Sequence, residues 1–282
     1  MIDGDLAGLF TSLFDDASMF PPQDEPPSSA VADHLAHRMA WYADMVGPFV
    51  CSAGRLSTIN DLAARHGVER LAVAVVVPGG LQALLRTVDA SRECQQVRLA
   101  GIEVPLGPHS LVDALTHLVP LVSQGIRVYL EIPVHSVTEH DVHTLAPSGV
   151  RLKLRTGGTS IEAFQSEENL ATPIVLCAAE RLAFKCTAGL HNAIRQRDRA
   201  TFFEHHGFLN IALAARVAAA TGSHAATRRM LAEQDPRVIA RQVGALTAAD
   251  VRATRALFNS FGTCSIDEPI GDLLQLGLVS AS

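Results

Sequence analysis

Short apolar segments alternate along this chain with amphipathic ones. The clearest apolar segment is 71–77, a β-branched run that ends at Pro78 and two glycines. A run of this kind is typical of a strand that is covered on both faces, as in a parallel sheet. The same criteria predict five further strands, at residues 48–53, 97–104, 127–132, 150–155 and 182–187.

Helices are predicted between these strands from capping residues, stop signals and apolar spacing. The expected helices cover 30–46 after the cap Ser29, a segment from Thr58 to Gly67, 81–90, a segment from Ser110 to Gly125, 138–145, and a helix that begins at Thr172 and Pro173.

Six strands that alternate with helices through short connections indicate a parallel sheet with right-handed crossovers. The first strand-to-helix turn lacks G-x-G-x-x-G, and polar residues recur at almost every strand end. These features favour a closed (β/α)8 TIM-type barrel with outer helices over an open doubly wound sheet. The eighth strand is expected at 260–266. The seventh is open, because 206–214 fits a strand running into a helix or a helix throughout.

The expected domain organisation is an N-terminal helical extension, residues 1–47, packed on a single barrel domain, residues 48–282. Within the extension, Leu13-Phe-Asp-Asp-Ala-Ser-Met-Phe-Pro-Pro22 has apolar anchors and a Pro-Pro stop. This segment either plugs the bottom of the barrel or caps its mouth and presents Asp15 or Asp16 to a ligand.

Composition narrows the class of protein. The chain has 282 residues, 48% hydrophobic and 18% charged, with a formal net charge of −6, so neither nucleic acid nor an anionic membrane is expected as a partner. Five cysteines without a C-x-x-C pair indicate reduced thiols, and neither a signal peptide nor a membrane span is recognisable. We therefore expect a cytoplasmic protein, and a homo-oligomer is left open.

Two lysines lie near the ends of predicted neighbouring strands. Lys153 and Lys185 each sit in an otherwise apolar segment, where a lysine carries a large desolvation cost. Such a lysine is either paired with an anion or kept at lowered pKa as a nucleophile or base. A lysine flanked by a second cation has a lowered pKa, and its partly neutral amine can form a Schiff base with a carbonyl compound. Glu103 or Glu131, at the ends of earlier strands, would then move protons.

The remaining candidate site residues also lie at strand ends, the functional face of such a barrel. Strand alternation puts Arg155 on the face of Lys153, and Thr187 on the face of Lys185. Of the adjacent His205 and His206 only one can face the site, and His206 is the preferred one. The predicted substrate-binding residues are Arg155, Thr187, His191, His206, Asn210, Gly157, Gly158, Ser265 and Glu268. The expected ligand is a small anionic molecule, without a cofactor.

Lys153-x-x-Thr156-Gly157 and Lys185-x-Thr187-x-Gly189 resemble the lysine strands of the deoxyribose-phosphate aldolase group, which are class I aldolases. The resemblance implies a lyase in which Lys185 forms the Schiff base and Lys153 lowers its pKa. This chain departs from the group in offering glutamates in place of an aspartate proton shuttle, and in carrying His191 at a position that is basic in their motif.

The whole chain is also similar to an uncharacterised bacterial family of about this size. The similarity rests on the segment 13–22 and on the motifs KLRTGG at 153–158, FKCTAGLH at 184–191, HGFLN at 206–210 and FGTCSIDEP at 261–269. It implies no particular activity.

Alternatives remain open. Both lysines could be structural ion-pair partners of Glu103 and Glu131, which would leave a non-catalytic anion-binding barrel. A metal-assisted isomerase or hydrolase would use the two glutamates and a histidine. His140 and His143 are spaced as metal ligands, but they lie on a predicted surface helix without a third ligand, and no metal site is expected there.

Overall fold

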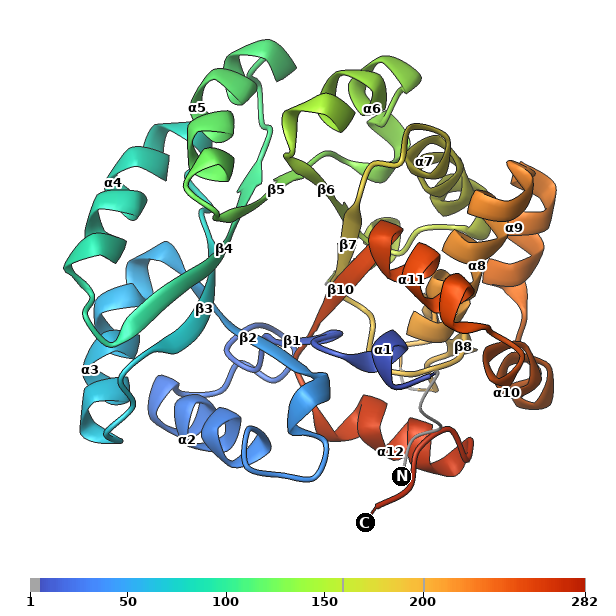
Figure 1. Ribbon diagram of the computed structural model, residues 1–282, viewed down its shortest axis with the longest axis horizontal. Coiled ribbons are helices and arrows are strands. Elements are labelled where there is room, and N and C mark those ends of the chain that lie inside the picture. Colours follow the sequence, from blue (N-terminus) through green and yellow to red (C-terminus); the bar gives the residue numbers. More distant parts are fainter. Residues whose placement is uncertain (1–5, 159, 200, 282) are drawn as a thin grey trace.

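The computed structural model describes residues 6–158, 160–199 and 201–281. Eight strands close into a barrel in the order β1-β10-β7-β6-β5-β4-β3-β2, and every neighbouring pair is parallel (Figure 1). The predicted (β/α)8 barrel is confirmed. Its strands are β1 (Phe14–Asp16), β2 (Val46–Ser52), β3 (Leu71–Val76), β4 (Val97–Pro105), β5 (Arg127–Glu131), β6 (Arg151–Arg155), β7 (Phe184–Thr187) and β10 (Phe258–Thr263).

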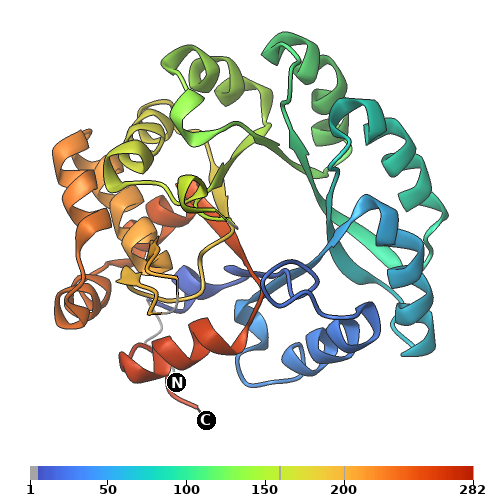
Figure 2. The same cartoon turned by 180° about the vertical axis from the view of Figure 1, so that it is seen from behind.

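Helices surround the barrel in both views (Figures 1 and 2). They are α1 (Ala7–Phe10), α2 (Pro27–His37), α3 (Leu56–Arg65), α4 (Gly80–Glu93), α5 (Leu111–Ser123), α6 (Glu139–Leu145), α7 (Glu167–Glu180), α8 (Phe208–Thr221), α9 (His224–Ala232), α10 (Pro236–Gly244), α11 (Ala248–Leu257) and α12 (Asp267–Gln275). None of these helices has the length and apolar character that a membrane crossing needs, within the ranges described.

The smaller elements lie in the connections. Single 3₁₀ turns are η1 (Ala43–Met45), η2 (Ala53–Arg55), η3 (Val134–Ser136), η4 (Ala146–Ser148) and η5 (Ile161–Ala163), and a two-stranded antiparallel hairpin pairs β8 (Gln196–Arg197) with β9 (Glu204–His205).

Two of the predicted helix starts are confirmed in atomic detail. The Ser110 side chain accepts a hydrogen bond from the Asp113 N–H at the start of α5, and Thr138 forms a reciprocal capping box with Asp141 at the start of α6. The predicted start at Thr172 is wrong. Helix α7 begins earlier, because Ser166 caps it by accepting from the Asn169 N–H, and Pro173 lies inside the helix.

The missing strand lies in the expected extension. Residues Phe14–Asp16 form β1, which pairs with β10 on one side and with β2 on the other. Residues 14–16 are therefore a barrel strand and not a plug, while Phe20, Pro21 and Pro22 line the large cavity at the mouth of the barrel. A domain boundary at residue 47 separates β1 from its barrel and cuts β2. Of the two alternatives left open for 206–214, the helical one is confirmed, because α8 begins at Phe208.

Aromatic packing fixes β1 against the rest of the molecule. The Phe14 ring lies 5.4 Å from the Phe261 ring on β10 and 5.5 Å from the Phe208 ring on α8, both edge-on. All three side chains are completely buried. Aromatic contacts of this kind add stabilisation beyond the burial of area. Contacts with β10 and α8 therefore help to hold this strand of three residues in place.

Candidate active site

The two lysines lie side by side in the barrel. Lys153 on β6 is in direct register with Lys185 on β7, and their side chains are only 3% and 1% exposed. The alternation of strand residues leaves Leu154 and Cys186 buried on the opposite face. The expected convergence of the two amines inside the barrel is therefore present.

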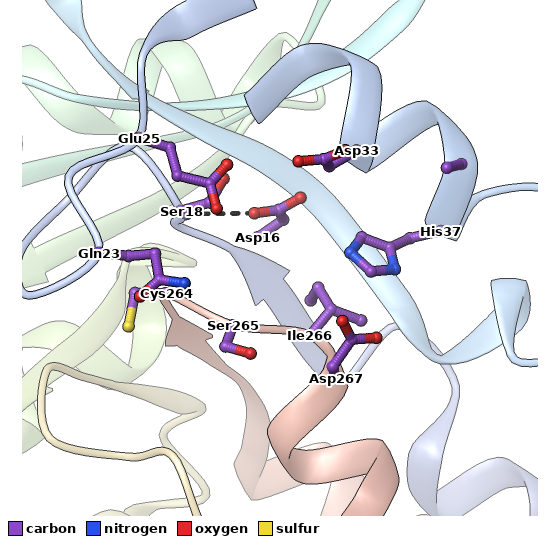
Figure 3. A pocket seen from close by; sticks show the side chains of 11 residues that line it. Asp16, Ser18, Gln23, Glu25, Asp33, His37, Cys264, Ser265, Ile266 and Asp267 are labelled. Carbon is purple, nitrogen blue, oxygen red and sulfur yellow. Dashed lines mark hydrogen bonds between the residues drawn. The ribbon is translucent and has the colours of Figure 1, made fainter. Parts of the chain in front are cut away.

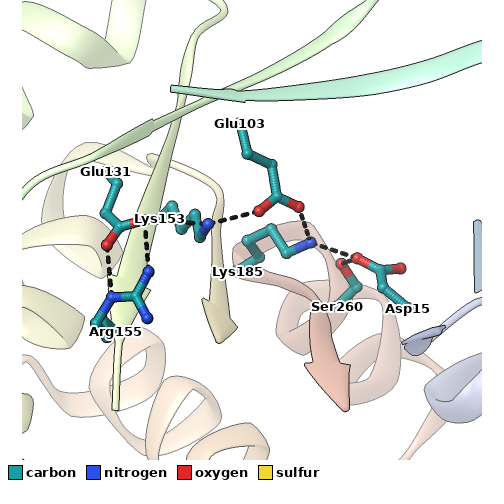
Figure 4. A network of polar contacts seen from close by, with 7 residues as sticks. All are labelled: Asp15, Glu103, Glu131, Lys153, Arg155, Lys185 and Ser260. Carbon is teal, nitrogen blue, oxygen red and sulfur yellow. Dashed lines mark hydrogen bonds and ion pairs between the residues drawn. The ribbon is translucent and has the colours of Figure 1, made fainter. Parts of the chain in front are cut away.

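Five strands contribute to an alternating series of charges around these lysines (Figure 4). The Lys153 ammonium contacts Glu103 at 2.6 Å and Glu131 at 3.0 Å. The Lys185 ammonium contacts Glu103 and Asp15, each at 2.5 Å.

The series continues at both ends. Arg155 Nε donates to Glu131 at 2.7 Å, and the Ser260 hydroxyl donates to Asp15 at 2.8 Å. Three cations thus face three carboxylates, and this balance lets the barrel bury charges that would be very costly if unpaired.

Lys153 and Lys185 are the only lysines in the chain, which has 21 arginines. Arginine serves as well as lysine in buried ion pairs, but only lysine can lose its proton and act as an amine. The side chain that can act as an amine therefore occurs at this one location in the chain.

The charges of the network set the ionisation of its members. Burial would lower the pKa of Lys185, but the charges of Asp15 and Glu103 outweigh burial and raise it. Burial would raise the pKa of Glu103, but the charges of Lys153 and Lys185 bring it down to about 2. The expectation that Lys153 lowers the pKa of Lys185 is therefore wrong for the resting site. The two carboxylates that contact the Lys185 ammonium group raise its pKa, and the second cation does not compensate for their effect.

Asp15 differs from the other carboxylates. Burial raises its pKa, and the opposing effect of Lys185 does not cancel that increase. A carboxylate with raised pKa, 2.5 Å from an ammonium group, is well suited to accept a proton from it.

A cavity of about 710 Å³ opens above this network. Both lysines and Glu103 line it, together with Arg155, Gly158, Thr187, His191, His205, Cys264 and Glu268. This volume accommodates a small metabolite. Five of the predicted substrate-binding residues are brought together in this lining: Arg155, Gly158, Thr187, His191 and Glu268.

Gly157 and Gly189 allow two strand ends to approach closely. A Cβ atom on Gly157 would lie 2.9 Å from the Gly189 Cα, and Gly189 itself has φ +70°. Thr156, whose hydroxyl donates to the Ala188 carbonyl at 2.7 Å, joins the same two turns. The glycines of both lysine motifs thus serve backbone packing, with Gly158 at the cavity surface.

His191 lies at the rim of the cavity between two partners. Its Nδ1 is 3.1 Å from Glu268 and 3.4 Å from the Cys264 sulfur. Burial would lower the pKa of His191, but these contacts raise it to about 10. The rim therefore carries a positive imidazolium at neutral pH.

Two predicted site residues have structural surroundings instead. His206 is 1% exposed, and its ring contacts Arg195 at 3.2 Å and the Gln165 carbonyl at 2.9 Å. Asn210 is completely buried, accepts from the Arg195 N–H and donates to the carbonyls of Met230 in α9 and Glu233 just after it. The histidine that lines the cavity is its neighbour His205, so the choice between the pair was reversed.

Ser265 lines a second, smaller cavity of about 270 Å³ beside α2 and the start of α12 (Figure 3). Its lining is acidic, with Asp16, Glu25, Asp33 and Asp267. Burial and the charges of Asp33 and Asp16 raise the pKa of Glu25. Glu131, in contrast, belongs to the charge network but not to the lining of the larger cavity.

Asp15, Ser260 and Cys264 complete the site. Ser260 and Cys264 were not among the predicted site residues, and Asp15 was expected only under the alternative in which segment 13–22 caps the mouth. Strand β1 has only three residues, too few for an alternation signal. The neighbouring apolar residues Leu13 and Phe14 were the only sign that Asp15 follows a buried segment.

Comparison with known proteins adds no assignment: no family model matches the chain, and no curated protein does. Within the described ranges, no three His, Cys, Asp or Glu side chains are grouped as ligands for a metal ion. Both Glu103 oxygens are engaged by lysines. The described residues therefore contain no group of ligands that would serve the metal-assisted alternative.

Proposed function

We propose that this protein is a lyase of the class I aldolase type, which acts on a small carbonyl compound bearing a phosphate or carboxylate through a Schiff base on Lys185. The observation that carries the proposal is the location of the only two lysines, in register on β6 and β7 at the floor of one cavity. The resemblance of both lysine motifs to the deoxyribose-phosphate aldolase group supports it. Membership of the uncharacterised bacterial family is part of the same proposal.

The first step is the release of a proton from Lys185. Asp15 is the acceptor, because it contacts the ammonium group at 2.5 Å and its pKa is raised. Transfer converts a buried ion pair into a neutral amine and a neutral acid. The raised pKa of Lys185 opposes this transfer, and burial offsets part of the cost because it favours the neutral forms. Lys153 holds Glu103 ionised and so keeps the second carboxylate from competing for that proton.

The amine then attacks the carbonyl carbon and forms a carbinolamine. The proton held by Asp15 goes to the departing hydroxyl group, so that water leaves and an imine forms. Cleavage of a carbon–carbon bond then sends its electron pair toward the protonated imine nitrogen and forms an enamine, while the hydroxyl group on the departing fragment gives its proton to Asp15 and becomes the carbonyl of the aldehyde that leaves. The rim cations Arg155 and His191 would hold the phosphate or carboxylate of the substrate.

Borohydride reduction tests the proposal, with pyruvate and glyceraldehyde 3-phosphate as carboxylate-bearing and phosphate-bearing probes. Only the two lysines and the terminal amine can be trapped in this chain. We expect a reduced adduct on Lys185 in the wild-type protein and its loss in Lys185→Arg, which keeps the cation for Asp15 and Glu103. Reduction confined to the terminal amine or Lys153 contradicts the proposal.

A second candidate is a non-catalytic anion-binding barrel. The favouring observation is that each lysine already has two carboxylate partners, as expected of structural ion pairs. This candidate predicts binding of both probes without any reducible adduct, so the same experiment separates the two.

A further inference from the structure

Cys264 lies at the end of β10 in a setting that none of the other four cysteines shares. It lines the large cavity and contacts the His191 ring nitrogen Nδ1 at 3.4 Å. The others are Cys51, Cys177 and Cys186, which are buried in the core, and Cys94, which is partly exposed at the end of α4. Burial raises the pKa of all four of these thiols.

Glu268 determines which atom carries the proton in this cluster. An ionised carboxylate can only accept hydrogen bonds, and Glu268 lies 3.1 Å from His191 Nδ1. Nδ1 must therefore carry a hydrogen, and the Cys264 sulfur beside it is placed as an acceptor. A thiolate accepts this hydrogen bond far better than a thiol, because the donor is then part of an imidazolium ion.

The surroundings of the pair are suited to keep it charged. The His191 side chain is 17% exposed, and the His205 ring, with a pKa lowered mainly by burial, lies 6.3 Å away. The contacts with Cys264 and Glu268 raise the pKa of His191, which agrees with an imidazolium at this position.

From this geometry we infer that Cys264 and His191, oriented by Glu268, form a second nucleophilic centre in the cavity, which adds reversibly to an aldehyde. The Cys264 thiolate, paired with the His191 imidazolium, attacks the carbonyl carbon. A sulfur–carbon bond forms as the π electrons of the carbonyl move to oxygen, and the oxygen takes a proton from the imidazolium, which becomes a neutral imidazole. The product is a thiohemiacetal, and no oxidant or reductant is needed.

This centre is separate from Lys185. Gly262 is in register with Thr187, two residues beyond Lys185, and Cys264 follows Gly262 by two residues. Four residues of strand correspond to about 13 Å. The inference goes beyond the proposed function and does not depend on Schiff base formation.

Iodoacetamide labelling at neutral pH, with peptide mapping, tests the nucleophile. We expect Cys264 to react at least about tenfold faster than Cys94, the partly exposed internal reference, because the thiolate is the reactive form. His191→Ala should remove that advantage, and His143→Ala, on the exposed face of α6, serves as the matched control. Labelling of Cys264 no faster than Cys94, or unchanged in a folded His191→Ala protein, overturns the inference.

Carbon-13 NMR with [1-¹³C]acetaldehyde tests the addition itself. The wild-type protein should show a thiohemiacetal resonance that disappears in Cys264→Ser, a nearly isosteric change. Its absence from the wild-type spectrum overturns the addition. An imine resonance has a distinct chemical shift and reports on amines and not on Cys264, so failure of this inference and failure of the proposed function are distinguishable.

Discussion

At the scale of single residues, the site depends on the matching of buried charges. Lys185 is 1% exposed and has its two carboxylate partners at 2.5 Å. Neither carboxylate has another cation that could fully replace it, because Glu103 shares Lys153 with Glu131, and Asp15 otherwise contacts only the Ser260 hydroxyl among the described contacts. The lysine is therefore needed for the stability of the site as well as for the proposed chemistry.

Lys185→Met should lower the free energy of unfolding by about 3–5 kcal/mol at neutral pH, because it leaves buried carboxylates without their partner. Urea denaturation measures this loss. Arg92→Met, which removes an exposed ion pair to Asp89, is the control and should change stability by less than about 1 kcal/mol. Equal stability of the two variants would show that the network is not buried as described.

His191 should make stability depend on pH. Its pKa rises from the ordinary 6.5 to about 10 on folding, so its contribution is fully present below 6.5 and is lost as the pH rises through 10. The wild-type protein should lose stability over this range, and His191→Gln should lose less. Urea denaturation at the two ends of the range is the measurement, and identical pH profiles would contradict the raised pKa.

Residue-level prediction from the sequence succeeded where a strand pattern was long. Lys153 and Lys185 lie in apolar segments of ordinary length, so alternation gave their common face. It failed for the ionisation of Lys185, because Asp15 is 170 positions away in the chain. It also failed for His206 and Asn210, which face a buried layer between α8 and its neighbours.

At the scale of elements, the turns after β6 and β7 hold the cavity edge together. Gly189 has φ +70°, and a Cβ there would lie 3.1 Å from the Gly157 Cα. The two lysine strands end in these turns, so the spacing of the turns controls where the strand ends present their side chains.

Gly189→Ala should destabilise the fold more than Gly67→Ala. Both positions have positive φ, which costs about 1–2 kcal/mol for alanine, but an added Cβ meets nothing within 4 Å at Gly67. The excess loss at Gly189 therefore measures the close approach alone. Urea denaturation of the two variants provides it, and equal losses would contradict tight packing of the turns.

Element prediction was limited by context that local sequence does not carry. Helix α8 is buried on nearly all sides, with Phe208, Leu209, Ile211 and Leu213 in the core, and a uniformly apolar segment has no period that separates helix from strand. Strand β1 has three residues and is stabilised by pairing with β2 and β10. Capping residues act locally, and Ser110 and Thr138 were correctly identified. The predicted starts at Ser29 and Thr58 were wrong, because both residues lie inside helices that begin earlier, at Pro27 and Leu56.

At the scale of the whole molecule, the barrel closes through its N-terminal segment. Strand β1 joins β10 to β2, the last and second strands of the chain in the barrel, and supplies Asp15 to the charge network. Architecture and site are therefore completed by the same three residues. The general fold followed from the strand and helix rhythm, but the identity of the closing strand did not.

Removal of residues 1–47 should prevent closure of the barrel. In the remaining chain, β10 and the shortened β2 would each lose β1 as their neighbour and expose an unpaired edge. Unpaired parallel edges are unstable. Circular dichroism and urea denaturation should show loss of the cooperative unfolding transition of the full chain. A truncated protein that unfolds with an unchanged midpoint would restore the boundary expected from the sequence.

The most direct test of the central claim is NMR of protein labelled with ¹⁵N at the lysine side chains. With two lysines in the chain, the spectrum contains one resonance for each amine, and Lys153→Arg and Lys185→Arg assign them. We predict two protected ammonium signals at neutral pH, and conversion of the Lys185 signal to an imine when pyruvate or glyceraldehyde 3-phosphate is added. Two signals that remain ammonium ions with every carbonyl probe would contradict the account.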